Sequence, residues 1–190
     1  MKKPTICPPL IVGIIIVLFY IFEGAFLNDS ISRHYPEDMH MFVLRVWGVF
    51  PQLCVLSTLV YSANFTKTKS SYISIGFAIA AILLSVLWAL ESFWTPLYYE
   101  SWLVFKYSWL TVIIAIGFFI DNHKQNTLVV VSSIAYMICI FLRPAVKLWI
   151  DFTSIDVSFE VFLWIDRIEN IIVPCWIFSA CTIKQVSKTK

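Results

Sequence analysis

The chain has 190 residues, of which 59% are hydrophobic and 14% are charged, and its mean hydropathy is +0.81. Soluble domains are close to half apolar and a quarter charged, so this composition excludes an ordinary soluble domain. The net charge of +2 provides no basic surface for nucleic acid, which excludes that class of partner. We therefore expect one transmembrane domain that covers residues 1–190.

Six apolar segments follow one another along the chain, and each is long enough to cross a bilayer as a helix. They cover approximately residues 9–27, 41–63, 72–93, 98–120, 128–149 and 161–183. Strands are excluded because an open sheet edge would leave backbone polar groups unsatisfied in lipid. The predicted fold is an all-α, polytopic membrane protein: a bundle of six transmembrane helices.

Two of these segments, the first and the fifth, have features that bear on where their helices begin or end. The first follows Lys2 and Lys3 as a signal peptide would, but no small-residue cleavage site comes after it, so we expect an uncleaved helix. The fifth has its apolar run interrupted at Arg143-Pro144, which predicts a kinked turn or an interfacial helix in its remainder. We expect longer loops at residues 28–40 and 144–160.

Basic residues outside the apolar segments lie mostly on one side of the predicted membrane. That side holds Lys2, Lys3, Lys67, Lys69, Lys124, Lys184, Lys188 and Lys190. The loops on the other side hold only Arg33 and Lys147. The positive-inside rule then predicts that both termini are cytoplasmic, in a plasma membrane or the inner membrane of a bacterium.

Charged side chains are also present within the predicted helices or at their boundaries. They are Glu23, Arg45, Glu91, Lys106, Arg143, Asp166, Arg167 and Glu169. All lie in the external half of their segments on this topology. Since a charge near the bilayer centre costs about 2.5–3.5 kcal/mol, such residues usually face the bundle interior and form pairs.

Helical spacing places several of these charges in stripes with polar or aromatic neighbours. Asp166 and Glu169 are three residues apart and share a face of the sixth segment. The other stripes are Arg45, Gly48 and Gln52; Trp88 and Glu91; Tyr99, Trp102, Lys106 and Trp109; and Ser132, Tyr136, Cys139 and Arg143. A polar cavity between several helices would produce this pattern.

Two prolines lie inside predicted helices, Pro51 in the second and Pro174 in the sixth. Each removes the hydrogen-bond donor for the carbonyl four residues earlier, which belongs to Trp47 or Asn170. Freed carbonyls are tolerated in membranes where they line a cavity or meet other polar groups.

The five cysteines are interpreted as packing residues, because no pair lies in an external loop. No metal site is predicted, since the chain has no C-x-x-C pair and only three histidines. Motifs of hydrolases, metalloproteases and nucleotide-binding proteins are also absent, so we predict no cofactor and favour a protein that is not an enzyme.

The leading hypothesis is a binding or transport protein with an externally open pocket for a small polar or amphiphilic molecule. The residues expected to line the pocket are the eight charged residues above together with Trp102. One alternative is a non-catalytic accessory, subunit or protective protein, whose charge layer is a structural salt-bridge network or pairs with a partner. A second alternative is an intramembrane enzyme that modifies lipids, with Asp166 or Glu169 as base.

The expected partners follow from these hypotheses. Membrane lipids would surround the bundle, and a membrane-protein partner or a second copy could pack against it. Ala81, Ser85 and Ala89 recur every four residues in the third segment, a spacing that allows close helix approach. We expect this face to pack centrally or at a dimer contact.

Overall fold

The computed structural model describes residues 7–34, 37–91, 98–153 and 159–183. This part of the chain forms six helices and contains no strand. The helices are α1 (Pro8–His34), α2 (Glu37–Ala63), α3 (Lys69–Glu91), α4 (Tyr98–Asn122), α5 (Thr127–Thr153) and α6 (Phe159–Ala180). The all-α prediction is confirmed, and each predicted segment corresponds to one helix.

The two predicted long loops are wrong in the described residues. Helix α1 extends beyond its apolar segment to His34, and α2 already begins at Glu37. Helix α5 continues through residue 144 to Thr153, so Arg143-Pro144 does not end it. Apolar length therefore underestimates these helices, because a helix continues into polar sequence as long as its backbone hydrogen bonds are maintained.

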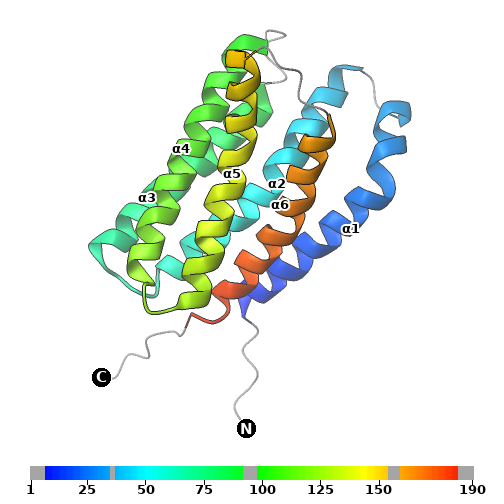
Figure 1. Ribbon diagram of the computed structural model, residues 1–190. Coiled ribbons are helices and arrows are strands. Elements are labelled where there is room, and N and C mark those ends of the chain that lie inside the picture. The colour runs from blue at the N-terminus through cyan, green and yellow to red at the C-terminus, as the bar shows by residue number, and fades with distance from the viewer. Residues whose placement is uncertain (1–6, 35–36, 92–97, 154–158, 184–190) are drawn as a thin grey trace.

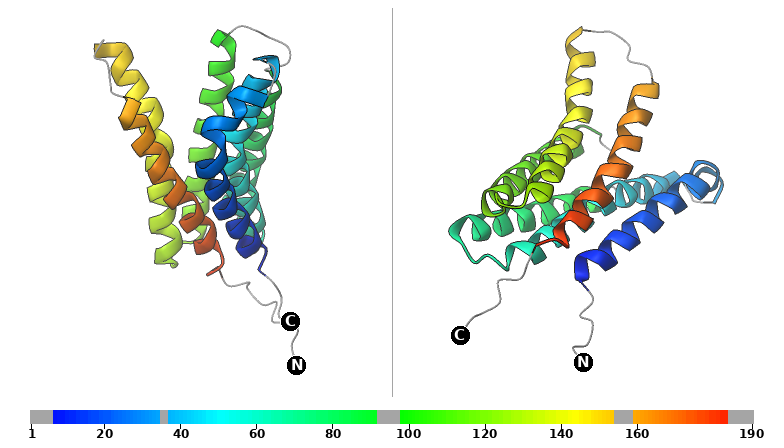
Figure 2. Two further views of the ribbon diagram at one scale, coloured as in Figure 1. Left: turned by 90° about the vertical axis from the view of Figure 1, so that its right-hand side faces the viewer. Right: turned by 60° about the horizontal axis from the view of Figure 1, so that its bottom comes forward.

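Successive helices run in opposite directions, and α1 begins at the same end of the bundle where α6 finishes (Figure 1). We call this the terminal end. Helix α2 is central, since it packs against α1, α3, α4 and α6. The most extensive packing is between α3 and α4, and α5 packs mainly on α6. Helices α5 and α6 lean away from the others towards the opposite end, as the left view of Figure 2 shows.

The predicted small-residue face of α3 lies inside the bundle. Ala81, Ser85 and Ala89 are all buried, and α3 packs against α2 and α4. The absence of bulky side chains lets these helices approach closely. The central-packing prediction is confirmed, and this face is not available for a dimer contact.

The apolar core of the described side chains extends from the terminal end to the middle of the bundle. Its largest fully buried side chains are Trp176, Tyr136, Phe119, Ile16, Leu56, Leu59, Ile116 and Ile177. Trp176 of α6 donates its indole N–H to Ser133 Oγ of α5 at 2.8 Å. Its ring lies 5.7 Å from that of Phe119, so one residue connects three helices.

Short polar contacts join the connections at the terminal end. Thr68 accepts a hydrogen bond from the backbone N–H of Ser71 and so caps α3, and its hydroxyl donates to Asn122. Ser70 donates to Asp121 at 2.9 Å, and Lys124 forms an exposed ion pair with the same carboxylate at 2.6 Å. These contacts connect the end of α4 to the start of α3.

His123 follows α4 and is buried, with 7% of its surface exposed. Its Nδ1 lies 2.9 Å from the carbonyl oxygen of Phe119, which can only accept, so Nδ1 carries the proton. Nε2 is then a buried acceptor with no hydrogen-bond partner. Burial lowers the pKa of His123 below its ordinary value, although the bond to Phe119 opposes this.

Two of the helices in the described residues are long and apolar enough to cross a membrane: Arg45–Ala63 with 19 residues and Lys69–Leu90 with 22. Shorter apolar stretches occupy Pro8–Phe22, Ser108–Asn122 and Thr127–Leu142. The core helix of a soluble protein can pass the same test, so these two helices give weak support to a membrane location.

Candidate binding cavity

Three polar side chains from three helices meet in the middle of the bundle. Gln52 of α2 donates through Nε2 to Ser85 Oγ of α3 at 3.1 Å and to Ser108 Oγ of α4 at 2.9 Å. The two serine oxygens are 2.9 Å apart. We call Gln52, Ser85 and Ser108 the polar triad.

The direction of each hydrogen bond in the polar triad follows from a count of protons. Ser85 donates its one hydroxyl proton to the carbonyl of Ala81, so Ser108 must donate to Ser85. Gln52 has two amide N–H groups, and both are used by the serines. The hydrogen-bonding atom of Gln52 that remains for other partners is its carbonyl oxygen, Oε1.

A cavity of about 50 Å³ lies beside the polar triad. Helices α2, α4, α5 and α6 provide its lining residues: Gly48, Gln52, Trp109, Tyr136, Cys139, Ile140 and Glu169. The volume is enough for a few water molecules or a molecule of few heavy atoms. It is well below the 300–1,000 Å³ that is typical of sites for drug-sized ligands.

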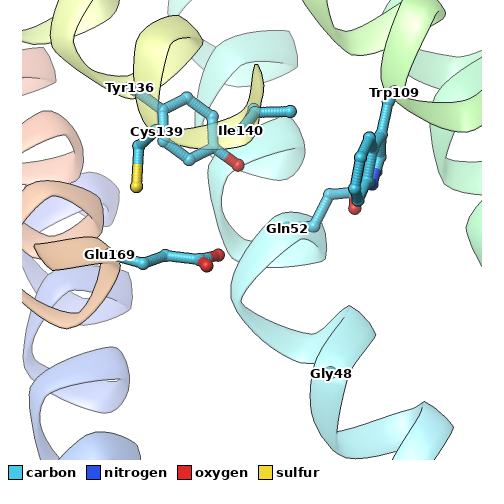
Figure 3. Close-up of a pocket in the computed structure, with 7 residues that line it drawn as sticks. All are labelled: Gly48, Gln52, Trp109, Tyr136, Cys139, Ile140 and Glu169. Carbon is cyan, nitrogen blue, oxygen red and sulfur yellow. The ribbon is translucent and has the colours of Figure 1, made fainter. Parts of the chain in front are cut away.

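The polar groups of this cavity come from opposite walls. In Figure 3 the carboxylate of Glu169 and the hydroxyl of Tyr136 point into the same space. Glu169 is also close enough to Tyr136 for an electrostatic interaction between them. Gln52 and the indole ring of Trp109 form the wall on the other side (Figure 3). A bound molecule would therefore meet a carboxylate, a phenol, an amide and an aromatic face.

Local backbone features help to form the cavity. Gly48 leaves space in the wall, because nothing lies within 4 Å of where its Cβ would be. Pro51 lies inside α2 between Gly48 and Gln52, and Pro174 lies inside α6. The carbonyls that these prolines leave without helical donors belong to Trp47 of α2 and Asn170 of α6, and neither residue lines the cavity.

The described charged residues predicted to share one pocket are not all at the cavity. Glu169 lines it, whereas Arg45, Asp166 and Arg167 are not among its lining residues. Arg45 is buried against α3, where it donates to the carbonyl of Trp88 at 3.1 Å and lies 5.4 Å from that ring. Arg167 lies 4.9 Å from the ring of Trp164 on its own helix.

The remaining predicted site residues lie on described helices, but their side chains lie outside the described part of the structure. They are Glu23 on α1, Glu91 on α3, Trp102 and Lys106 on α4, and Arg143 on α5.

Several lining residues belong to the predicted stripes but were not among the predicted site residues. Gly48 and Gln52 share the stripe of Arg45, Trp109 shares that of Lys106, and Tyr136 and Cys139 share that of Arg143. Ser108 belongs to none of the predicted stripes. A search of the sequence for all polar residues in the middle of the predicted helices, and not only for charged ones, would have included all three residues of the polar triad.

Among the described residues no group of three His, Cys, Asp or Glu side chains could hold a metal ion. No protein-family model, curated protein or solved structure matches the chain. Its function is therefore inferred from its residues and their geometry.

Proposed function

We propose that the chain is a multi-pass plasma-membrane protein, with six spans and both termini in the cytoplasm. The helices contain 22–27 residues, and about 20 are needed to cross the hydrocarbon core. Each helix also has large apolar side chains exposed on its outer surface, such as Ile21, Val46, Leu83, Leu110, Ile138 and Ile171. Soluble monomers rarely expose apolar surface on every element, whereas lipid would cover it.

Within this bundle, the cavity beside the polar triad is the proposed binding site. It would bind a small polar molecule, or carry one across the membrane. The observation behind this proposal is the convergence of Glu169, Tyr136, Gln52 and Trp109 from four helices on one cavity. Polar and aromatic side chains from facing helices that surround a volume provide the kind of lining that small-molecule sites use.

The size of the cavity narrows the type of ligand. About 50 Å³ admits a few heavy atoms, so the described conformation favours a small polar molecule over an amphiphile.

Native mass spectrometry of gently extracted protein tests this proposal. Wild type is compared with Glu169→Gln, which keeps the shape of the lining and removes its charge. We expect a small adduct on the wild type that is lost from the variant. Asp166→Asn is the matched control, since it neutralises an acid three residues away that does not line the cavity.

The other outcomes separate the alternatives. If the adduct persists in Glu169→Gln, the cavity is not its site. A bound polypeptide in place of a small adduct supports the accessory-protein hypothesis, in which the charge layer contacts a partner. Protein without any adduct in all three samples supports a purely structural role for the polar groups.

A further inference from the structure

Two cysteines at opposite ends of the sequence meet at the terminal end of the bundle. Cys7 directly precedes α1, and Cys181 directly follows α6. Their side chains are close enough to influence each other electrostatically. Figure 1 shows the first turn of α1 next to the last turn of α6.

The packing of α1 on α6 explains why these thiols meet. At Gly13, a Cβ atom would lie only 2.4 Å from the ring of Phe178. The two antiparallel helices are therefore in close contact six residues after Cys7 and three residues before Cys181. The turns that carry the cysteines are also fixed, because Leu10 N donates to Cys7 O at 2.9 Å and Cys181 N donates to Phe178 O at 3.0 Å.

The other three thiols do not lie at the helix ends where α1 meets α6, although Cys54 is partly exposed and Cys175 is exposed. Cys54, Cys139 and Cys175 lie within α2, α5 and α6, and Cys139 is buried. Cys7 and Cys181 are both partly exposed, so a small reagent can reach them. None of the five cysteines forms a disulfide in the structure.

We propose that Cys7 and Cys181 form a reversible disulfide that locks the first helix to the last. The oxidant is a small-molecule disulfide such as glutathione disulfide. The thiolate of one cysteine attacks it, forms a mixed disulfide and releases one glutathione as its thiol. The thiolate of the second cysteine then attacks the protein sulfur, closes the Cys7–Cys181 bond and releases the second glutathione. Two protein protons are lost, and two glutathione thiols are formed.

The compartment determines when the lock closes. On the proposed topology the pair lies at the cytoplasmic end, where glutathione and thioredoxin keep thiols reduced. The bond would form only under oxidative conditions and open again when reducing conditions return. Closed, it would hold the terminal end of α6, the helix that carries Glu169, against α1.

Intact-mass spectrometry of the full chain with glutathione disulfide tests the lock. We expect the wild type to lose the mass of two hydrogen atoms and its count of alkylatable thiols to fall by two. Dithiothreitol should restore both values. Peptide mapping after digestion should identify a peptide that links Cys7 to Cys181.

Single variants identify the pair and provide the control. Cys7→Ser and Cys181→Ser should each accumulate a glutathione adduct in place of the mass loss, because the second thiol is missing. Cys175→Ser, which removes an exposed thiol from the middle of α6, should behave as the wild type does. A stable adduct on the wild type, no reaction, or a link between other cysteines would each overturn the proposal.

Discussion

The terminal end of the bundle and the region around the cavity use polar side chains in different ways. At the terminal end, Thr68, Ser70 and Asn122 bond to one another or to nearby backbone and join two connections. Around the cavity, Gln52, Tyr136 and Glu169 come from three helices and face a space. In the first region the polar groups connect segments, whereas in the second they surround a volume.

This difference distinguishes structural polar residues from candidate functional ones, which the amino-acid composition of the chain cannot do. A polar residue at a helix end has backbone and water as partners, so its presence needs no further explanation. A polar residue in the middle of an apolar helix bonds to its own backbone, as Ser85 does to Ala81, or to side chains of other helices, as Gln52 does. Where such partners leave space between them, binding becomes the best hypothesis.

The largest expected effect is at the apolar core near the terminal end. Trp176→Ala removes a fully buried indole and its bond to Ser133, so we expect a loss of about 3–5 kcal/mol in unfolding free energy. Titration with a denaturing detergent, followed by circular dichroism, measures this. Trp109→Ala removes the same side chain from a wall that already borders a cavity, and its cost should be less than half as large. Equal costs would show that the two regions are packed alike.

An intermediate effect is expected in the polar triad. Gln52→Leu removes two hydrogen bonds and should cost about 1–2 kcal/mol in the same titration. Ser70→Ala breaks the bond to Asp121 at the exposed terminal end, where water replaces it, and should cost less. If Ser70→Ala lowers the unfolding free energy more than Gln52→Leu does, polar contacts at the terminal end stabilise the fold more than those of the polar triad. This result would contradict the prediction.

The smallest expected effect is a pH dependence that originates at the terminal end. Because burial lowers the pKa of His123 in the folded protein, the unfolded chain takes up its proton first. The contribution of neutral His123 to the unfolding free energy is therefore fully present above the ordinary histidine pKa of about 6.5, and it decreases as the pH drops below that value. Melting temperatures measured between pH 8 and 5 should show this decrease.

His123→Phe is the matched variant, since it keeps a ring against Phe119 and cannot titrate. Its melting temperature should vary less over this range than that of the wild type. Asp121 acts in a lower window: hydrogen bonds from Lys124 and Ser70 lower its pKa, so its contribution is lost only as the pH falls through that lowered value. An unchanged slope in His123→Phe would mean that another group causes the acid sensitivity.

The number, order and approximate bounds of the helices could be predicted from the sequence, because each apolar segment produces one helix. The helix ends could not, since α1 continues through polar sequence to His34 and α5 continues four residues past its predicted end to Thr153. Hydropathy measures the preference for lipid, whereas helix length depends on backbone hydrogen bonds that continue outside an apolar layer.

The cavity could be predicted only in part. Periodicity placed Gln52, Tyr136 and Glu169 on polar stripes, but it does not indicate which stripes face each other. Arg45 illustrates the limit: its place in a stripe suggested a pocket, whereas its guanidinium bonds to the backbone of Trp88. The contact between Cys7 and Cys181 depends on how the first and last helices pack, and nothing local to either cysteine indicates it.

The polar triad has a consequence for how this sequence can evolve. Both amide protons of Gln52 and both serine hydroxyl protons have an acceptor. A substitution at one position therefore leaves hydrogen-bonding groups at the other two positions without their partner. Losing Gln52 alone is harmful, whereas replacing all three residues by apolar ones removes the mismatch. Substitutions at positions 52, 85 and 108 should therefore be strongly epistatic, with lineages that keep all three residues or none of them.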